Sequence, residues 1–141
     1  MQKIFDEVNS LDKRCYEKYF LTEDILMEHA ASSMCKYIED NFEENKSVLI
    51  LCGSGNNGAD GIALARLLYS KFDVSLYLNS DLKSPMAKQQ EKRTKSLNVK
   101  IVDEVFETDI IVDCLFGTGL NKPIDSKTQT LIKTLNSYNS F

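Results

Sequence analysis

The stretch that decides the fold is Val48-Leu49-Ile50-Leu51-Cys52-Gly53-Ser54-Gly55-Asn56-Asn57-Gly58-Ala59-Asp60-Gly61. Its first five residues are apolar without interruption, which is typical of a central parallel strand with helices on both faces. Residues 53–61 are expected to form a polar, glycine-rich turn. The apolar residues from Ile62 onward then follow helical spacing to about Ser70. The order strand, glycine turn, helix opens an α/β domain.

The rest of the chain repeats this alternation of strands and helices. Two helices are expected first, one capped by Ser10 and ending near Tyr19, and one running from Thr22 to about Phe42. After the glycine turn we expect strands at 74–78, 99–102 and 110–114, a helix from Ser84 with Pro85 in its first turn, and a helix at 126–135.

This order predicts a three-layer α-β-α fold with a Rossmann-like, doubly wound and mainly parallel sheet. We expect one domain over residues 1–141, in which N-terminal helices (1–46) precede the Rossmann-like core (47–141).

Charge and composition narrow the possible partners. The chain has 17 Lys and Arg against 21 Asp and Glu, a net charge of −4, so nothing attracts it globally to nucleic acid or to an anionic membrane. No apolar run reaches the ~18 residues of a membrane span, and no targeting segment is recognisable. The four cysteines are widely separated and are expected to be reduced. A cytoplasmic protein is therefore expected.

The first glycine turn has the chemistry of a phosphate site. Gly53, Gly55 and Gly58 satisfy G-x-G-x-x-G between a strand and a helix, where backbone N–H groups and the helix dipole favour an anion. The alternative is that these glycines only form a tight turn. Asn56, Asn57 and Asp60 favour a ligand or an ion, since buried amides and carboxylates need partners.

A second glycine turn, Phe116 to Leu120, follows the strand that ends at Cys114. If the first and fourth strands are neighbours, the two turns meet at the carboxyl edge of the sheet, where α/β proteins bind ligands. Lys122 could then neutralise a phosphate. Oxygen atoms of Asn57 and Asp113 would suit an alkali or alkaline-earth cation, although Asp113 could instead cap local backbone donors.

These residues resemble the NAD(P)H-hydrate epimerases, also called the YjeF N-terminal domain family. The family motif G-x-G-N-N-G-G-D-G appears at 53–61, with Ala59 in place of a glycine, and V-D-x-x-F-G-T-G-L is intact at 112–120. A segment similar to L-M-E-N-A-G lies at 26–31, with His29 and Ala31 as departures.

The resemblance implies an isomerase that interconverts the R and S epimers of hydrated NADH and NADPH, so that an NAD(P)H-hydrate dehydratase can restore the cofactor. It implies a potassium ion held by Asn57 and Asp113. It also implies a substrate site formed by Asn56, Asn57, Gly58, Ala59 and Asp60 from the first turn and by Gly117, Thr118, Gly119, Leu120, Asn121, Lys122 and Pro123 from the second.

The family domain continues through a V-D-x-P-S-G strand, whose Asp contacts substrate and whose Ser completes the potassium site. This motif is not found before Phe141, so the catalytic acid is expected beyond it and the sheet is expected to be incomplete at its C-terminal edge. An open sheet edge favours pairing with another chain, which predicts self-association as a homodimer.

Two other functions fit the sequence. An NAD-dependent dehydrogenase domain would use Asp81, near the end of the second strand, to hold a ribose hydroxyl. A catalytically silent nucleotide-binding or protein-interaction module would keep both turns but lack the acid for proton transfer.

Overall fold

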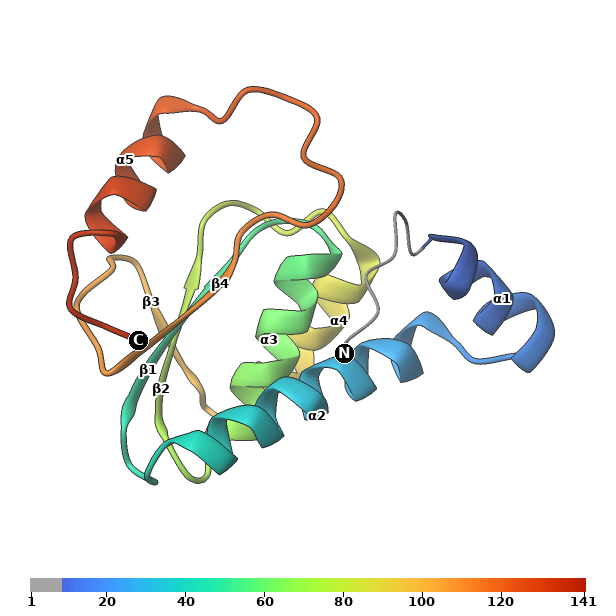
Figure 1. Ribbon diagram of the computed structural model, residues 1–141, viewed down its shortest axis with the longest axis horizontal. Helices are drawn as coiled ribbons and strands as arrows, with labels where there is room; N and C mark the ends of the chain where they lie inside the picture. Colours follow the sequence, from blue (N-terminus) through green and yellow to red (C-terminus); the bar gives the residue numbers. More distant parts are fainter. Residues whose placement is uncertain (1–8) are drawn as a thin grey trace, which may run out of the picture.

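The computed structural model describes residues 9–141 and contains one parallel sheet (Figure 1). Its strands are β1 (Ser47–Cys52), β2 (Asp73–Leu78), β3 (Lys100–Val102) and β4 (Ile110–Cys114), in the order β3-β2-β1-β4. Both neighbours of β1 run parallel to it, and Cys52 is the register partner of Cys114. The predicted parallel sheet, the central first strand and its contact with the fourth strand are confirmed.

The helices are α1 (Asn9–Tyr19), α2 (Glu23–Asn41), α3 (Asn56–Leu68), α4 (Pro85–Lys95) and α5 (Ser126–Leu135). Helices α2, α3 and α4 lie on one face of the sheet and α5 lies on the other, while α1 lies away from the sheet (Figure 1). No helix in residues 9–141 is long and apolar enough to cross a membrane.

Strand β1 shows how the two faces are filled. Val48, Ile50 and Cys52 point into the core shared with α2, α3 and α4, whereas Leu49 and Leu51 point into the core shared with α5. All five side chains are 0% exposed. The uninterrupted apolar run therefore reflects burial on both faces, and the predicted three-layer α/β fold is confirmed.

Two boundaries differ from the sequence prediction. Helix α3 begins at Asn56, so most of the expected turn 53–61 is helical, with the Ala59 N–H already donating to the Gly55 carbonyl at 3.1 Å. Gly58 and Gly61 suggested a turn because glycine is a poor helix former, but both are buried and their packing overrides that preference. Ser10 lies within α1 rather than before it.

The outer edge of β4 has only a one-residue partner within the described residues. The Phe141 N–H donates to the Asp109 carbonyl at 3.0 Å, and the Ile111 N–H donates to the Phe141 carbonyl at 2.9 Å. This is the hydrogen-bond pattern of a parallel bridge opposite Ile110. A groove of about 430 Å³ lies beside this edge, between α2 and β4.

Candidate functional site

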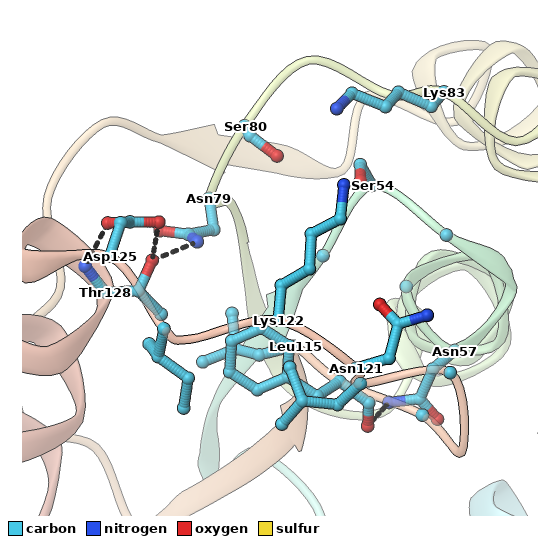
Figure 2. Close-up of a pocket in the computed structure, with 18 of the residues that line it drawn as sticks. Ser54, Asn57, Asn79, Ser80, Lys83, Leu115, Asn121, Lys122, Asp125 and Thr128 are labelled. Atoms are coloured by element: carbon cyan, nitrogen blue, oxygen red, sulfur yellow. Dashed lines mark hydrogen bonds between the residues drawn. The ribbon is translucent and has the colours of Figure 1, made fainter.

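A cavity of about 850 Å³ lies at the carboxyl ends of β1, β2 and β4 (Figure 2). The loops after these strands and the first turn of α5 form its walls. The wall residues are Gly53–Gly58, Asn79, Ser80, Lys83, Leu115–Asp125, Lys127 and Thr128. The cavity thus has the place expected for a ligand in an open parallel sheet.

Close backbone contacts join the two glycine turns. The Gly53 N–H donates to the Cys114 carbonyl at 3.0 Å, and a Cβ atom on Gly53 would lie 2.0 Å from the Leu115 carbonyl oxygen. A Cβ on Gly58 would lie 2.0 Å from the Gly53 oxygen. Only glycine fits at both positions, so these residues hold the turns together. A Cβ on Gly55, in contrast, would meet nothing within 4 Å, so Gly55 leaves its part of the cavity open.

The start of α3 forms part of the cavity wall. Gly55 is the N-cap residue and makes no side-chain capping bond. The first N–H groups of a helix have no partners within the helix, and its dipole places partial positive charge there. Since Asn56, Asn57 and Gly58 line the cavity, these donors favour a phosphate.

The Asn56 side chain has a structural role. Its Nδ2 donates to Glu23 at 2.5 Å, and its Oδ1 accepts a short hydrogen bond from the Ser84 hydroxyl. The same hydroxyl accepts from the Met86 N–H at 3.1 Å and so caps α4. Asn56 therefore links the N-terminal ends of α2, α3 and α4, and its amide is already satisfied without a ligand.

Asn57 connects the two turns directly. Its Nδ2 donates to the Phe116 carbonyl at 2.8 Å, and a Cβ on Gly117 would lie 3.3 Å from the Asn57 Cβ. The predicted meeting of the two turns is confirmed. All the residues expected from the second turn, Gly117 to Pro123, line this one cavity.

Asp113 lies elsewhere. Its side chain is exposed, its Oδ1 accepts from the Leu115 N–H at 2.9 Å, and it lines the groove beside β4 rather than the cavity. The local capping bond considered from the sequence is therefore present. Asp113 and Asn57 nevertheless both bind the 115–116 segment, one at each of two adjacent residues.

Ala59 and Asp60 do not line the cavity. Ala59 is completely buried in the core and Asp60 is partly buried in α3. Burial, and secondly the nearby charge of Glu23, raise the pKa of Asp60 to about 6. The structure thus separates these two residues, together with Gly61, from the motif residues 53–58 that line the cavity.

The sequence prediction missed the polar residues that follow β2 and those that begin α5. The Asn79 N–H donates to the Cys52 carbonyl at 3.0 Å, and its side chain donates to Thr128 at 3.1 Å. Both oxygens of Asp125 accept hydrogen bonds from Thr128, and these bonds lower the pKa of Asp125. Asn79 could have been predicted as a site residue, because it follows the carboxyl end of a strand next to β1.

Lysines supply most of the charge on the cavity wall. Lys83, Lys122 and Lys127 line it, against Asp125 as the one carboxylate among the described lining residues. Asp81, the residue that a dehydrogenase would need for a ribose hydroxyl, is exposed and lies outside the wall. The geometry therefore suits a ligand with several negative charges.

Similar proteins were found by sequence and by structure. The model of the family described as YjeF-related protein N-terminus matches residues 23–141. A bifunctional NAD(P)H-hydrate repair enzyme Nnr of Helicobacter pylori is 40% identical over 84% of this chain, and an NAD(P)H-hydrate epimerase of Leuconostoc citreum is 34% identical over 92%. The crystal structure of yeast ynu0 has a TM-score of 0.72 and 23% identity over 89% of the chain, which supports the fold.

The chain spans only part of these proteins: 27% of the Helicobacter enzyme, 61% of the Leuconostoc enzyme and 60% of the yeast chain. The family model nevertheless covers most of this chain. The chain therefore belongs to the family of proteins related to the YjeF N-terminus.

Proposed function

We propose that the protein is an NAD(P)H-hydrate epimerase, an isomerase that interconverts the R and S epimers of hydrated NADH and NADPH in cofactor repair. The observation that carries this proposal is the single cavity in which both family turns meet. The Leuconostoc relative is named an NAD(P)H-hydrate epimerase and the Helicobacter relative a bifunctional NAD(P)H-hydrate repair enzyme, and both names support this proposal.

The cavity binds the substrate mainly through its phosphates. The N–H groups at the start of α3 receive the pyrophosphate, with Lys122 as the nearest cation of the second turn. A Cβ on Gly55 or Gly119 would meet nothing within 4 Å, so the backbone there leaves room for the ligand. Gly117 to Pro123 form the opposite wall and orient the remainder of the nucleotide.

Among its carboxylates, the described cavity wall offers no free acid or base for proton transfer. Asp125 is its one carboxylate, and both oxygens already accept hydrogen bonds from Thr128. The family resemblance implies an acid from a V-D-x-P-S-G strand, and residues 9–141 do not contain this motif. The same observation favours a second candidate function, a catalytically silent nucleotide-binding or protein-interaction module.

We further propose a potassium ion near the end of β4. The Asn57 amide oxygen and the Asp113 carboxylate are hard oxygen donors, and both side chains bind the same 115–116 segment. The described residues contain no group of three His, Cys, Asp or Glu side chains that could hold a metal ion, so a cation here would depend on the Asp113 carboxylate together with amide and carbonyl oxygens. Such a site suits a weakly held monovalent ion that orders the two turns.

The proposed reaction also implies functional partners for this protein. An NAD(P)H-hydrate dehydratase would act on the epimer produced here, and the bifunctional relative shows that a second activity can share one chain with this type of domain. A homodimer formed by strand pairing at the outer edge of β4, where Phe141 is the one partner within the described residues, is part of the same proposal. The four cysteines are all free, which supports a reducing compartment, the cytoplasm.

The test is to incubate the chain in potassium buffer with purified R epimer of hydrated NADPH and to follow the S epimer by chromatography. Conversion above the spontaneous rate is expected, and exchange of potassium for sodium should lower it. Lys122→Gln should lower the rate, whereas Lys133→Gln, on an exposed lysine of α5 outside the cavity, should leave it unchanged. Substrate binding without conversion would support the silent module instead.

A further inference from the structure

Lys83 is fixed beside the first glycine turn. Its backbone N–H and that of Ser84 both donate to the Ser54 carbonyl at 3.0 Å. These two bonds attach the segment after β2 to the turn after β1. The Lys83 side chain is exposed, lines the cavity, and has no hydrogen-bond or ion-pair partner within residues 9–141.

The cavity wall carries a net positive charge. Three lysines against one carboxylate give a net charge of +2 (3 − 1), in addition to the partial charge at the start of α3. Figure 2 shows the side chains of Lys83 and Lys122 extending toward the region around Ser54 from different loops. The net charge balances the two negative charges of a pyrophosphate, and the Lys83 ammonium, which pairs with no described residue, is available to a further phosphate group.

The position of Lys83 indicates which phosphate it meets. In Rossmann-like sheets the loop after the second strand reads the 2′ position of the adenosine ribose, with an acid for a hydroxyl and a basic residue for a phosphate. Here β2 is followed by Asn79 and Ser80, and the next residue, Asp81, does not line the cavity. The part of the described cavity wall that follows β2 therefore contains no acid, and its charged residue is Lys83.

We propose that Lys83 makes the site selective for hydrated NADPH over hydrated NADH by pairing with the 2′-phosphate. Ser80, on the same loop and the same wall, adds a hydroxyl donor to that phosphate. Lys122 remains with the pyrophosphate at the start of α3. This inference rests on the proposed function, since it names the preferred substrate of that site.

The test compares the affinities of adenosine 2′,5′-bisphosphate and AMP by isothermal titration calorimetry. The bisphosphate should bind about tenfold more tightly to the unmodified chain, as expected for one added charge-assisted contact. Lys83→Gln should reduce this ratio to less than about threefold while leaving AMP affinity nearly unchanged. Lys88→Gln removes an exposed lysine of α4 outside the cavity and should preserve the ratio.

Equal affinities in the unmodified chain, no binding of either ligand, or a ratio that Lys83→Gln leaves intact would overturn the inference. Epimerisation of both hydrated cofactors separates this result from failure of the proposed function. Equal kcat/KM values for the two cofactors, unaffected by Lys83→Gln, refute the selectivity and leave the epimerase standing. A preserved bisphosphate preference without epimerisation of either cofactor refutes only the epimerase.

Discussion

Replacing Asp60 with asparagine should increase the free energy of unfolding at neutral pH. Asp60 is partly buried in α3, where burial and the charge of Glu23 raise the pKa of its carboxyl from 3.8 to about 6. The folded protein therefore holds this proton more tightly than the unfolded chain does. The stabilisation from that proton is complete below about pH 4 and is lost as the pH rises through about 6. An asparagine at this position carries no charge at any of these pH values.

The pKa shift sets the size of the effect. A shift of about 2 units corresponds to roughly 3 kcal/mol, since each unit is worth about 1.36 kcal/mol. Partial exposure of Asp60 reduces this figure, and so does its position near the positive end of α3. We expect Asp60→Asn to stabilise the protein by about 2 kcal/mol at pH 7.5 and by close to zero at pH 4.

Urea denaturation followed by circular dichroism at pH 4, 5, 6 and 7.5 measures this difference. Asp103→Asn is the matched control, because Asp103 is an exposed carboxylate, and it should have little effect at any pH. Carbon-detected NMR titration of the Asp60 carboxyl provides an independent value. A carboxyl that titrates near pH 4, or an Asp60→Asn variant no more stable than the unmodified chain at pH 7.5, would refute this reasoning.

Two further predictions concern the turns and the thiols. Gly58→Ala should lower the free energy of unfolding by about 2 to 4 kcal/mol, because the new Cβ would lie 2.0 Å from a backbone oxygen. Gly55→Ala should lower it by less than about 1 kcal/mol, because a Cβ there meets nothing within 4 Å. Equal losses for the two variants in urea titrations would contradict this prediction. Ellman's reagent should modify the partly exposed Cys15 well before the buried Cys52 and Cys114. Burial raises the pKa of Cys114 to about 12 and the pKa of Cys52 well above its usual value, so both thiols stay protonated. Labelling of all three thiols at the same rate in the native protein would contradict this prediction.

The elements of this fold could be predicted because their signals are local. The apolar run at 48–52 identified a strand buried on both faces, and the two glycine motifs marked the loops that follow β1 and β4. The predicted start of α3 was wrong because it depends on packing between residues that are far apart in the sequence. Gly58 and Gly61 pack against Gly53 and the cysteines of β1 and β4, and this packing makes glycine necessary within a helix.

The candidate site likewise has features that the sequence predicted and features that only the tertiary structure decided. The sequence alone determined that Asn57 and the 117–123 segment line one cavity, because parallel strands carry their following loops to the same edge of the sheet. Only the tertiary structure decided that the Asn56 amide binds Glu23 and Ser84, 33 and 28 residues away, that Asp60 lies off the cavity, and that Lys83 lies on it. A motif fixes the path of the backbone, but the partner of each polar side chain depends on which distant elements pack beside it.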